Sequence, residues 1–319
     1  MSFTLETIQQ ARARIAPYIL QTPLLRLPAL DPYLGCQVYV KAECMQITGA
    51  FKLRGAMNKM LSLPREQLER GVAAASSGNH GRALSYAAKM LGVRATIIMP
   101  DTAPPVKLDA IRELGAEIVQ CAPQDRYATA DRVCAEQGSV LVPPFNDEDI
   151  MAGQGTAGLE IVERCPEVDT VIVPLSGGGL LGGVSTAVKA LSPNTKVYGA
   201  EPAPLPRYSV SLAQGEPVTV PQQPTIADAL IGNRPGSLCF PVIQAHVDGV
   251  AAVDDPVTLK AMELLLTQGK LLAEPSSCIG MAAVLQGLIP VSPEDKVCFL
   301  LSGGNVGLEQ LRILEDIPL

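Results

Sequence analysis

The sequence contains no tryptophan, only two histidines and 4% aromatic residues. Few aromatic side chains leave little surface on which exposed nucleic-acid bases can stack. Acidic residues outnumber basic residues and give a net charge of −7, whereas nucleic-acid phosphates attract clustered lysine and arginine. We therefore expect no nucleic-acid partner.

Long apolar runs and paired cysteines are also missing. No run reaches the roughly 20 apolar residues that cross a bilayer, and the N-terminal segment lacks the apolar core of a secretory signal. The eight cysteines stand singly, without a CxxC pair, and the two histidines do not cluster. These absences predict no membrane association, no zinc site, and reduced thiols in a cytoplasmic protein.

What the chain does have is length and apolar content. Its 319 residues, 47% of them hydrophobic, are enough for two domains with large cores. Short β-branched runs such as Ala95–Pro100, Thr170–Pro174 and Lys296–Leu301 alternate with helical patterns, which is typical of parallel strands joined by helices. The proline-rich stretch 202–224 is expected to be irregular. The fold class predicted is α/β, with open, mostly parallel sheets flanked by helices.

Four loops of small and polar residues flank predicted strands. They are TGAFKLRGA (48–56), SSGNHG (76–81), SGGGL (176–180) and LSGGN (301–305). Ligands of open α/β sheets bind beyond the carboxyl ends of the strands, so we expect these loops to converge.

The glycine cluster at 177–179 lies between a buried strand and a helix. Glycines allow backbone N–H groups to converge, and a helix N-terminus adds positive potential, so this loop is expected to hold a phosphate. A tight turn without a ligand is the plainer alternative. Gly177, Gly179 and Gly182 also fit the dinucleotide pattern GxGxxG, with Glu201 about 20 residues further on. A nicotinamide enzyme therefore stays open at this point.

A lysine in the first loop distinguishes a nicotinamide enzyme from a pyridoxal phosphate enzyme. Lys52 stands beside Phe51 at the start of a helical run, although most lysines are solvated and most phenylalanines belong to a core. In the second loop, Ser77 fits a helix cap, Asn79 a turn and His80 a hydrogen-bonded structural histidine. A lysine facing a glycine-rich phosphate site is what pyridoxal phosphate requires, and a hydride enzyme needs none. The combination favours pyridoxal phosphate.

Motifs along nearly the whole chain carry a family resemblance. They are GAFKLRGA (49–56), SSGNHG (76–81), AGQGTAGLEI (152–161), SGGGL (176–180), TIAD (225–228), EPSS (274–277) and LSGGN (301–305). With them the chain resembles the fold type II pyridoxal phosphate enzymes, in the branch of threonine/serine dehydratases and serine racemases. The resemblance implies a small domain at 49–146, a large domain built from 1–48 and 147–319, and a homodimer or homotetramer.

The resemblance also implies roles for individual residues. Lys52 would form the Schiff base with pyridoxal phosphate, Phe51 would pack beside the cofactor ring, Asn79 would bind the ring hydroxyl and Ser302 would face the pyridine nitrogen. The phosphate would be held by the consecutive backbone N–H groups of Gly177, Gly178, Gly179 and Leu180. The carboxylate of a small amino-acid substrate would be held by Ser76, Ser77 and the backbone around Asn79.

The activity implied is removal of water from a β-hydroxy amino acid such as L-threonine or L-serine, which releases a 2-oxo acid and ammonia. The Lys52 amine would take the α-proton. An amino-acid racemase of the same fold is the main alternative, because Ser77 stands where racemases of the family return a proton to the opposite face. A non-catalytic binding protein is the third reading, and the intact Lys52 speaks against it.

Several positions depart from the family pattern. Ala50 and Ala229 replace a usual serine and glycine, and an unusual segment follows at 230–234. These positions would border the substrate, so they leave open hydroxyaspartate or a hydroxyectoine-derived compound. Some relatives bind a divalent cation through a glutamate, a backbone carbonyl and an acid six residues after the glutamate. Here Glu201 is followed at that place by Arg207, so no metal site is expected.

Overall fold

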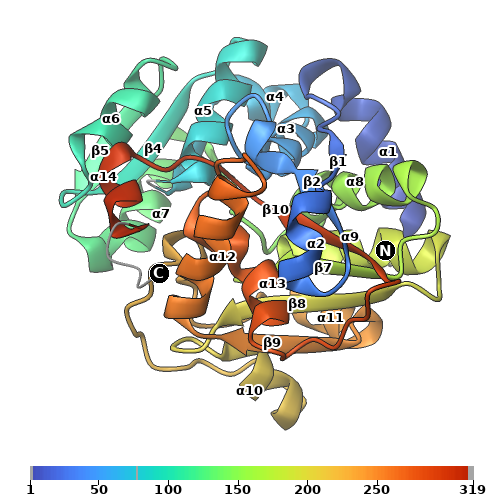
Figure 1. Cartoon of the computed structure of the whole chain (residues 1–319). Coiled ribbons are helices and arrows are strands. Elements are labelled where there is room, and N and C mark those ends of the chain that lie inside the picture. Colours follow the sequence, from blue (N-terminus) through green and yellow to red (C-terminus); the bar gives the residue numbers. More distant parts are fainter. Residues whose placement is uncertain (1–2, 77, 315–319) are drawn as a thin grey trace.

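Two separate β-sheets organise the computed structural model, which describes residues 3–76 and 78–314 (Figure 1). The larger sheet has six strands in the order β1-β2-β10-β7-β8-β9, and the smaller has four in the order β5-β4-β3-β6. Strands β1 and β2 pair antiparallel, and the other paired strands of both sheets run parallel. The predicted α/β class with mostly parallel sheets is confirmed.

The strands of the two sheets come from different parts of the chain. The larger sheet contains β1 (Leu24–Arg26), β2 (Gln37–Ala42), β7 (Thr170–Pro174), β8 (Lys196–Pro202), β9 (Gly249–Val253) and β10 (Lys296–Leu301). The smaller contains β3 (Val72–Ala75), β4 (Ala95–Pro100), β5 (Glu117–Cys121) and β6 (Val140–Leu141). The smaller sheet thus falls inside the predicted segment 49–146, and the division into two domains at these boundaries stays a prediction.

Helices surround both sheets. They are α1 (Leu5–Ile15), α2 (Asp31–Leu34), α3 (Lys52–Ser62), α4 (Arg65–Glu69), α5 (Asn79–Leu91), α6 (Pro105–Arg112), α7 (Arg126–Gln137), α8 (Glu148–Arg164), α9 (Gly179–Leu191), α10 (Arg207–Gln214), α11 (Cys239–His246), α12 (Asp255–Thr267), α13 (Pro275–Leu285) and α14 (Leu308–Leu311). Local residues set several of their ends. Asp147 caps α8 by accepting from the N–H of Ile150, and α5 ends at Gly92, whose φ is 66°.

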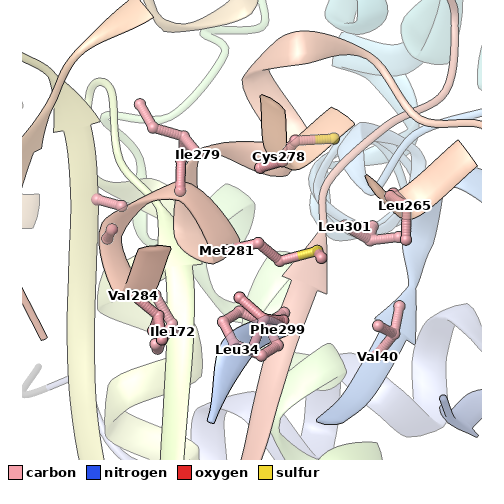
Figure 2. Close-up of a cluster of buried hydrophobic side chains, with 14 of the residues drawn as sticks. Leu34, Val40, Ile172, Leu265, Cys278, Ile279, Met281, Val284, Phe299 and Leu301 are labelled. Carbon is pink, nitrogen blue, oxygen red and sulfur yellow. The ribbon is translucent and has the colours of Figure 1, made fainter. Parts of the chain in front are cut away.

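The larger sheet is buried on both faces. Consecutive residues of β10 from Val297 to Leu301 are buried, as expected of a central parallel strand covered on both sides. Figure 2 shows one of these faces, where Met281 and Val284 of α13 lie against Ile172 of β7 and Phe299 of β10. This packing fixes β7 and β10 relative to each other, and two of the predicted ligand loops follow these strands.

The prediction of irregular structure over 202–224 was wrong in part, because α10 occupies Arg207–Gln214. The prolines of this stretch lie outside the helix, and Pro206 stands just before its first turn, where proline is tolerated. Arg207, Tyr208 and Ser211 of α10 are fully buried. Tertiary contacts therefore stabilise a helix that composition alone did not indicate.

Two simpler expectations concern cysteines and membranes. All eight cysteines are free thiols, as predicted. Across residues 3–76 and 78–314, no helix combines the length and apolar character that a membrane span requires.

Candidate active site

Three of the four predicted loops are joined by hydrogen bonds. The Phe51 N–H donates to the Ser302 carbonyl at 3.0 Å, and the Gly304 N–H donates to the Gly49 carbonyl at 2.9 Å. The side-chain amide of Asn305 donates to Asn79 Oδ1 at 2.8 Å, which brings in the start of α5. The expected convergence is confirmed for these loops.

Lys52 is the first residue of α3 and is partly buried. Its Nζ donates to the Pro144 carbonyl at 2.7 Å and lies 4.9 Å from the centre of the Phe51 ring. Burial lowers the pKa of Lys52 to about 8, against the opposing influence of Cys239 and Glu274. A larger fraction of this amine is therefore neutral, and so nucleophilic, than for a solvated lysine.

The glycine loop lies beside the segment that binds Lys52. Cβ atoms added to Gly177, Gly178 and Gly179 would lie 2.4 Å from the Phe145 ring, 2.0 Å from the Tyr208 hydroxyl and 2.6 Å from Gln154 Oε1. Gly178 also has a φ of 102°, which side chains disfavour. The first N–H groups of α9 have no acceptor within the helix. Bare backbone thus forms a cradle that fits an anion such as a phosphate.

Tyr208 fixes the shape of this cradle. Its hydroxyl donates to the Gly177 carbonyl at 3.0 Å, and the Gly236 N–H donates to the same carbonyl at 2.9 Å. Tyr208 was not among the predicted site residues, because it lies in the stretch 202–224 that was expected to be irregular. No local pattern marks a tyrosine as the support of a loop about 30 residues earlier in the chain.

Ser302 directly follows β10 and is buried. Its hydroxyl lies 3.0 Å from the hydroxyl of Ser277, which donates to the Gly303 carbonyl and accepts from the Gly303 N–H, both at 2.7 Å. Ser277 belongs to the EPSS motif but received no role from the sequence. It holds Ser302 in place as a neutral hydrogen-bonding group.

Glu274 is a second residue that the sequence analysis left without a role. Its two carboxylate oxygens lie 3.0 and 3.1 Å from the side-chain nitrogen of Asn79. Burial raises the pKa of Glu274 to about 7, although the hydrogen bond from Asn79 acts to lower it. The EPSS motif was the only signal for it, because its partner lies 195 positions earlier in the chain.

The structure describes Ser76 and His80 of the second loop but not Ser77. Ser76 follows β3 and accepts from the Gly78 N–H at 3.4 Å. Ser77 lies outside the described residues, so its predicted catalytic and substrate-binding roles stay predictions. His80 is buried with its Nε2 2.9 Å from the Val142 carbonyl, and burial lowers its pKa to about 3. It is a neutral, hydrogen-bonded histidine, as predicted.

Glu201 does not serve a dinucleotide. Its buried carboxylate accepts from the N–H groups of Tyr208 and Ser209 at 2.9 and 2.7 Å. A carboxylate that accepts these two N–H groups and the Ser209 hydroxyl is not free to bind a ribose. The match to the dinucleotide pattern is therefore coincidental.

A cavity of about 450 Å³ adjoins the site. Its wall includes Pro144, which binds Lys52, and Phe145, whose ring lies against Gly177. The segment 232–237 also lines the cavity, and it overlaps the unusual segment 230–234. Space for a small molecule therefore lies next to the lysine and the glycine loop.

A buried amine beside a glycine cradle, between two open sheets, defines an α/β enzyme that holds a phosphorylated, amine-reactive group. The model of the family described as "Pyridoxal-phosphate dependent enzyme" matches residues 15–303, and the chain belongs to this family. Its cofactor is pyridoxal phosphate (PLP), as predicted.

Three similar proteins indicate which branch of the family the chain resembles. The L-threonine ammonia-lyase of Thermotoga maritima is 39% identical, with 97% of this chain and 77% of that protein covered. The L-threo-3-hydroxyaspartate ammonia-lyase of Saccharomyces cerevisiae is 38% identical, with 98% and 97% covered. The solved structure of maize serine racemase superposes with a TM-score of 0.93 at 39% identity, with 98% and 96% covered. These proteins belong to the dehydratase and racemase branch that the motifs indicated.

Proposed function

We propose that this enzyme is a PLP-dependent ammonia-lyase that removes water from a β-hydroxy amino acid such as L-threonine or L-serine. The products are a 2-oxo acid and ammonia. The observation that carries the proposal is the buried Lys52 amine beside the glycine cradle. Two ammonia-lyases similar to the chain over nearly its whole length support it.

Four parts of the site would hold PLP. When bound, the cofactor supplies an aldehyde that reacts with amines and a ring that accommodates the negative charge left by a departing α-proton. The N–H groups of Gly177, Gly178, Gly179 and Leu180 would bind its phosphate. Phe51 would pack on its ring, Asn79 would donate to its hydroxyl, and Ser302 would hydrogen-bond its nitrogen. A neutral hydroxyl at that nitrogen leaves the ring less electron-withdrawing than a charged partner would.

Lys52 would carry the proton in the reaction. Its Nζ, with a pKa lowered to about 8 by burial, takes the proton from the α-carbon near neutral pH. The electron pair of that C–H bond forms a double bond to the β-carbon, the C–O bond breaks, and the hydroxyl leaves as water with the proton that Lys52 returns to it. The released enamine then hydrolyses to the 2-oxo acid and ammonia.

The substrate carboxylate would bind at the N-terminus of α5. Ser76 and Asn79 lie at the start of this 13-residue helix, Ser77 stands between them in the sequence, and a helix N-terminus favours an anion. We also propose that the protein works in the cytoplasm as a homodimer or homotetramer. Light scattering after gel filtration measures the oligomer.

A screen for 2-oxo acid release tests the activity. The purified holoenzyme is incubated with the stereoisomers of serine, threonine and 3-hydroxyaspartate, and chiral chromatography follows the remaining amino acid. The lyase is supported if the 2-oxo acid is released much faster than the unreacted amino acid changes its configuration. Inversion without 2-oxo acid would make the enzyme a racemase, and inertness towards the whole panel would support a binding protein.

Gly178→Ala is expected to weaken PLP binding by about 100-fold or more. The new methyl group would meet the Tyr208 hydroxyl at 2.0 Å, and alanine disfavours a φ of 102°. Titration of the apoenzyme, followed by cofactor absorbance, measures the affinity. The control is Gly182→Ala, whose methyl group would come within 3.2 Å of the flexible end of Met151 and otherwise make ordinary contacts at 3.7 Å or more. Equal affinities in the two variants would contradict a cradle built by the bare backbone at Gly178.

Glu274→Gln is expected to change how stability depends on pH. Burial raises the pKa of Glu274 to about 7 from an ordinary value of 4.5, so the folded protein holds this proton more tightly than the unfolded chain. The wild type therefore loses stability as pH rises from 4.5 to 7, by at most about 1.4 kcal/mol per pH unit. The variant lacks this loss.

Urea unfolding of the apo forms at pH 5 and pH 8 measures the difference. The stability of Glu274→Gln relative to wild type should increase between the two pH values. The matched control is Glu263→Gln on α12, since Glu263 is partly exposed and pairs with Lys260 on the surface. A constant difference between Glu274→Gln and wild type at both pH values would contradict the raised pKa.

A further inference from the structure

Arg207 and Glu201 form a fully buried ion pair behind the glycine loop. Both side chains have 0% exposure, and Arg207 Nε lies 3.7 Å from Glu201 Oε2. Glu201 comes from β8, and Arg207 is the first residue of α10. A buried charge is costly unless every polar atom around it is used, so the other contacts of this guanidinium reveal its role.

The guanidinium is surrounded by oxygen atoms. Its Nη1 donates to the Leu205 carbonyl at 2.9 Å, its Nη2 to the Leu175 carbonyl, and its Nε lies 3.3 Å from the Ser176 carbonyl. Together with Glu201 this set comprises one carboxylate and three carbonyls. Hard divalent cations prefer the same ligands, carboxylate and carbonyl oxygens.

A divalent cation does not fit beside this guanidinium. Cation-binding relatives of this family use a glutamate, which corresponds to Glu201, a backbone carbonyl, and an acid six residues after the glutamate, which corresponds to position 207. Here that position carries a positive charge which already binds those oxygens. In the part of the chain that the structure describes, no group of three His, Cys, Asp or Glu side chains is placed to hold a metal.

The contacts also orient the cradle. Arg207 binds the carbonyls of Leu175 and Ser176, and Tyr208 binds the next carbonyl, that of Gly177. In a trans peptide the N–H of the following residue points away from the carbonyl. Three successive carbonyls directed at the start of α10 therefore turn the N–H groups of Ser176, Gly177 and Gly178 to the other side of the loop.

We infer that the Arg207 guanidinium replaces the divalent cation of some relatives and positions the phosphate cradle of this enzyme without a metal. The inference rests on the cofactor of the family and not on the proposed substrate. Arg207 is a positioning residue, because it contacts the back of the loop and not the cofactor. Its effects should thus appear in PLP affinity and in thermal stability even if the lyase activity proves to be wrong.

The test compares the holoenzyme with three variants at position 207, each in EDTA and in excess MgCl₂. The readouts are the unfolding temperature and the dissociation constant for PLP. Wild type should show the same values in both conditions. Arg207→Met should bind PLP at least about tenfold more weakly in both, and Arg207→Lys should lose less because it keeps a charge with fewer donors.

The third variant is Arg207→Asp, which completes the oxygen set once the guanidinium is gone. It should resemble Arg207→Met in EDTA and recover PLP affinity and stability in MgCl₂. Arg112→Met is the control, because this exposed arginine pairs with Asp109 on the surface of α6, away from the glycine loop. It should match wild type, including its lack of response to MgCl₂.

Three results would overturn the inference. One is a wild-type enzyme that loses stability or PLP affinity in EDTA and regains it with MgCl₂. The second is full PLP affinity in Arg207→Met or, if that variant does not fold, in Arg207→Lys. The third is a folded Arg207→Asp that does not respond to MgCl₂.

Discussion

Lys52→Ala is expected to reduce 2-oxo acid release by about 10³-fold or more. The variant loses both the amine that bonds to PLP and the group that carries the α-proton, and the second loss alone is worth about 10²–10⁴ in rate. The glycine cradle, Asn79 and Ser302 stay in place, so the variant should still bind PLP. Initial rates of 2-oxo acid release with the best substrate of the panel measure the effect.

Borohydride reduction adds a readout that does not depend on the substrate. It should fix PLP on residue 52 of the wild type, as mass spectrometry of peptides can show, and leave no adduct in the variant. The control is Lys59→Ala on the same helix, because Lys59 pairs with Asp147 at 2.7 Å outside the proposed site. Wild-type rates in Lys52→Ala, or an adduct on another lysine, would contradict the mechanism.

Arg54→Met is expected to cost about 3–5 kcal/mol of unfolding free energy, the usual loss when one partner of a buried ion pair is removed. Arg54 lies within the first turn of α3 and binds Glu43 at 2.8 Å and Glu160 at 2.7 Å. Burial acts to raise the pKa of Glu43, but Arg54 and Lys41 hold it below its usual value. Without Arg54, Lys41 alone would remain to balance two buried carboxylates.

Urea unfolding of the apo forms measures this loss. Arg65→Met is the control, because its partner Glu69 and Arg65 itself have side chains 62% and 91% exposed, and such pairs contribute at most about 1 kcal/mol. Arg54→Lys should fall between wild type and Arg54→Met, since lysine keeps the charge but not the forked geometry. A loss below about 1 kcal/mol in Arg54→Met would show that the network is not needed for stability.

The network also links local sequence to the site. Arg54 belongs to the GAFKLRGA motif, in which the predicted site residues were Lys52 and Phe51 and Arg54 had no predicted role. In the structure, α3 is held by Glu43, just before the motif, and by Glu160 of α8. The motif therefore places the Lys52 amine and supplies the cation that anchors the helix carrying it.

The sequence by itself determined the secondary structure around the site and the chemical groups it offers. Hydrophobic periodicity and glycine positions predicted β7, β10, α5 and α9, and the loops between them, because these signals act over a few residues. Lysine, glycine-rich turns and the motif set were enough to predict PLP. The proline-rich composition of 202–224 led to a wrong prediction of irregular structure over α10, because this helix is stabilised by burial and not by a local sequence pattern.

Only the tertiary structure decided which side chains meet. Asn79 contacts Glu274 and Asn305, and Lys52 contacts Pro144, across 92 to 226 positions of the chain. The order of the strands contributes to such meetings: β2 lies beside β10 in the larger sheet, and β3 lies beside β6 in the smaller, so segments far apart in the sequence follow neighbouring strands. The same holds for Arg207. The sequence predicted only that an arginine at this position does not serve as a metal ligand. Its bonds to the glycine loop appear only once β7, β8 and α10 are packed together in space.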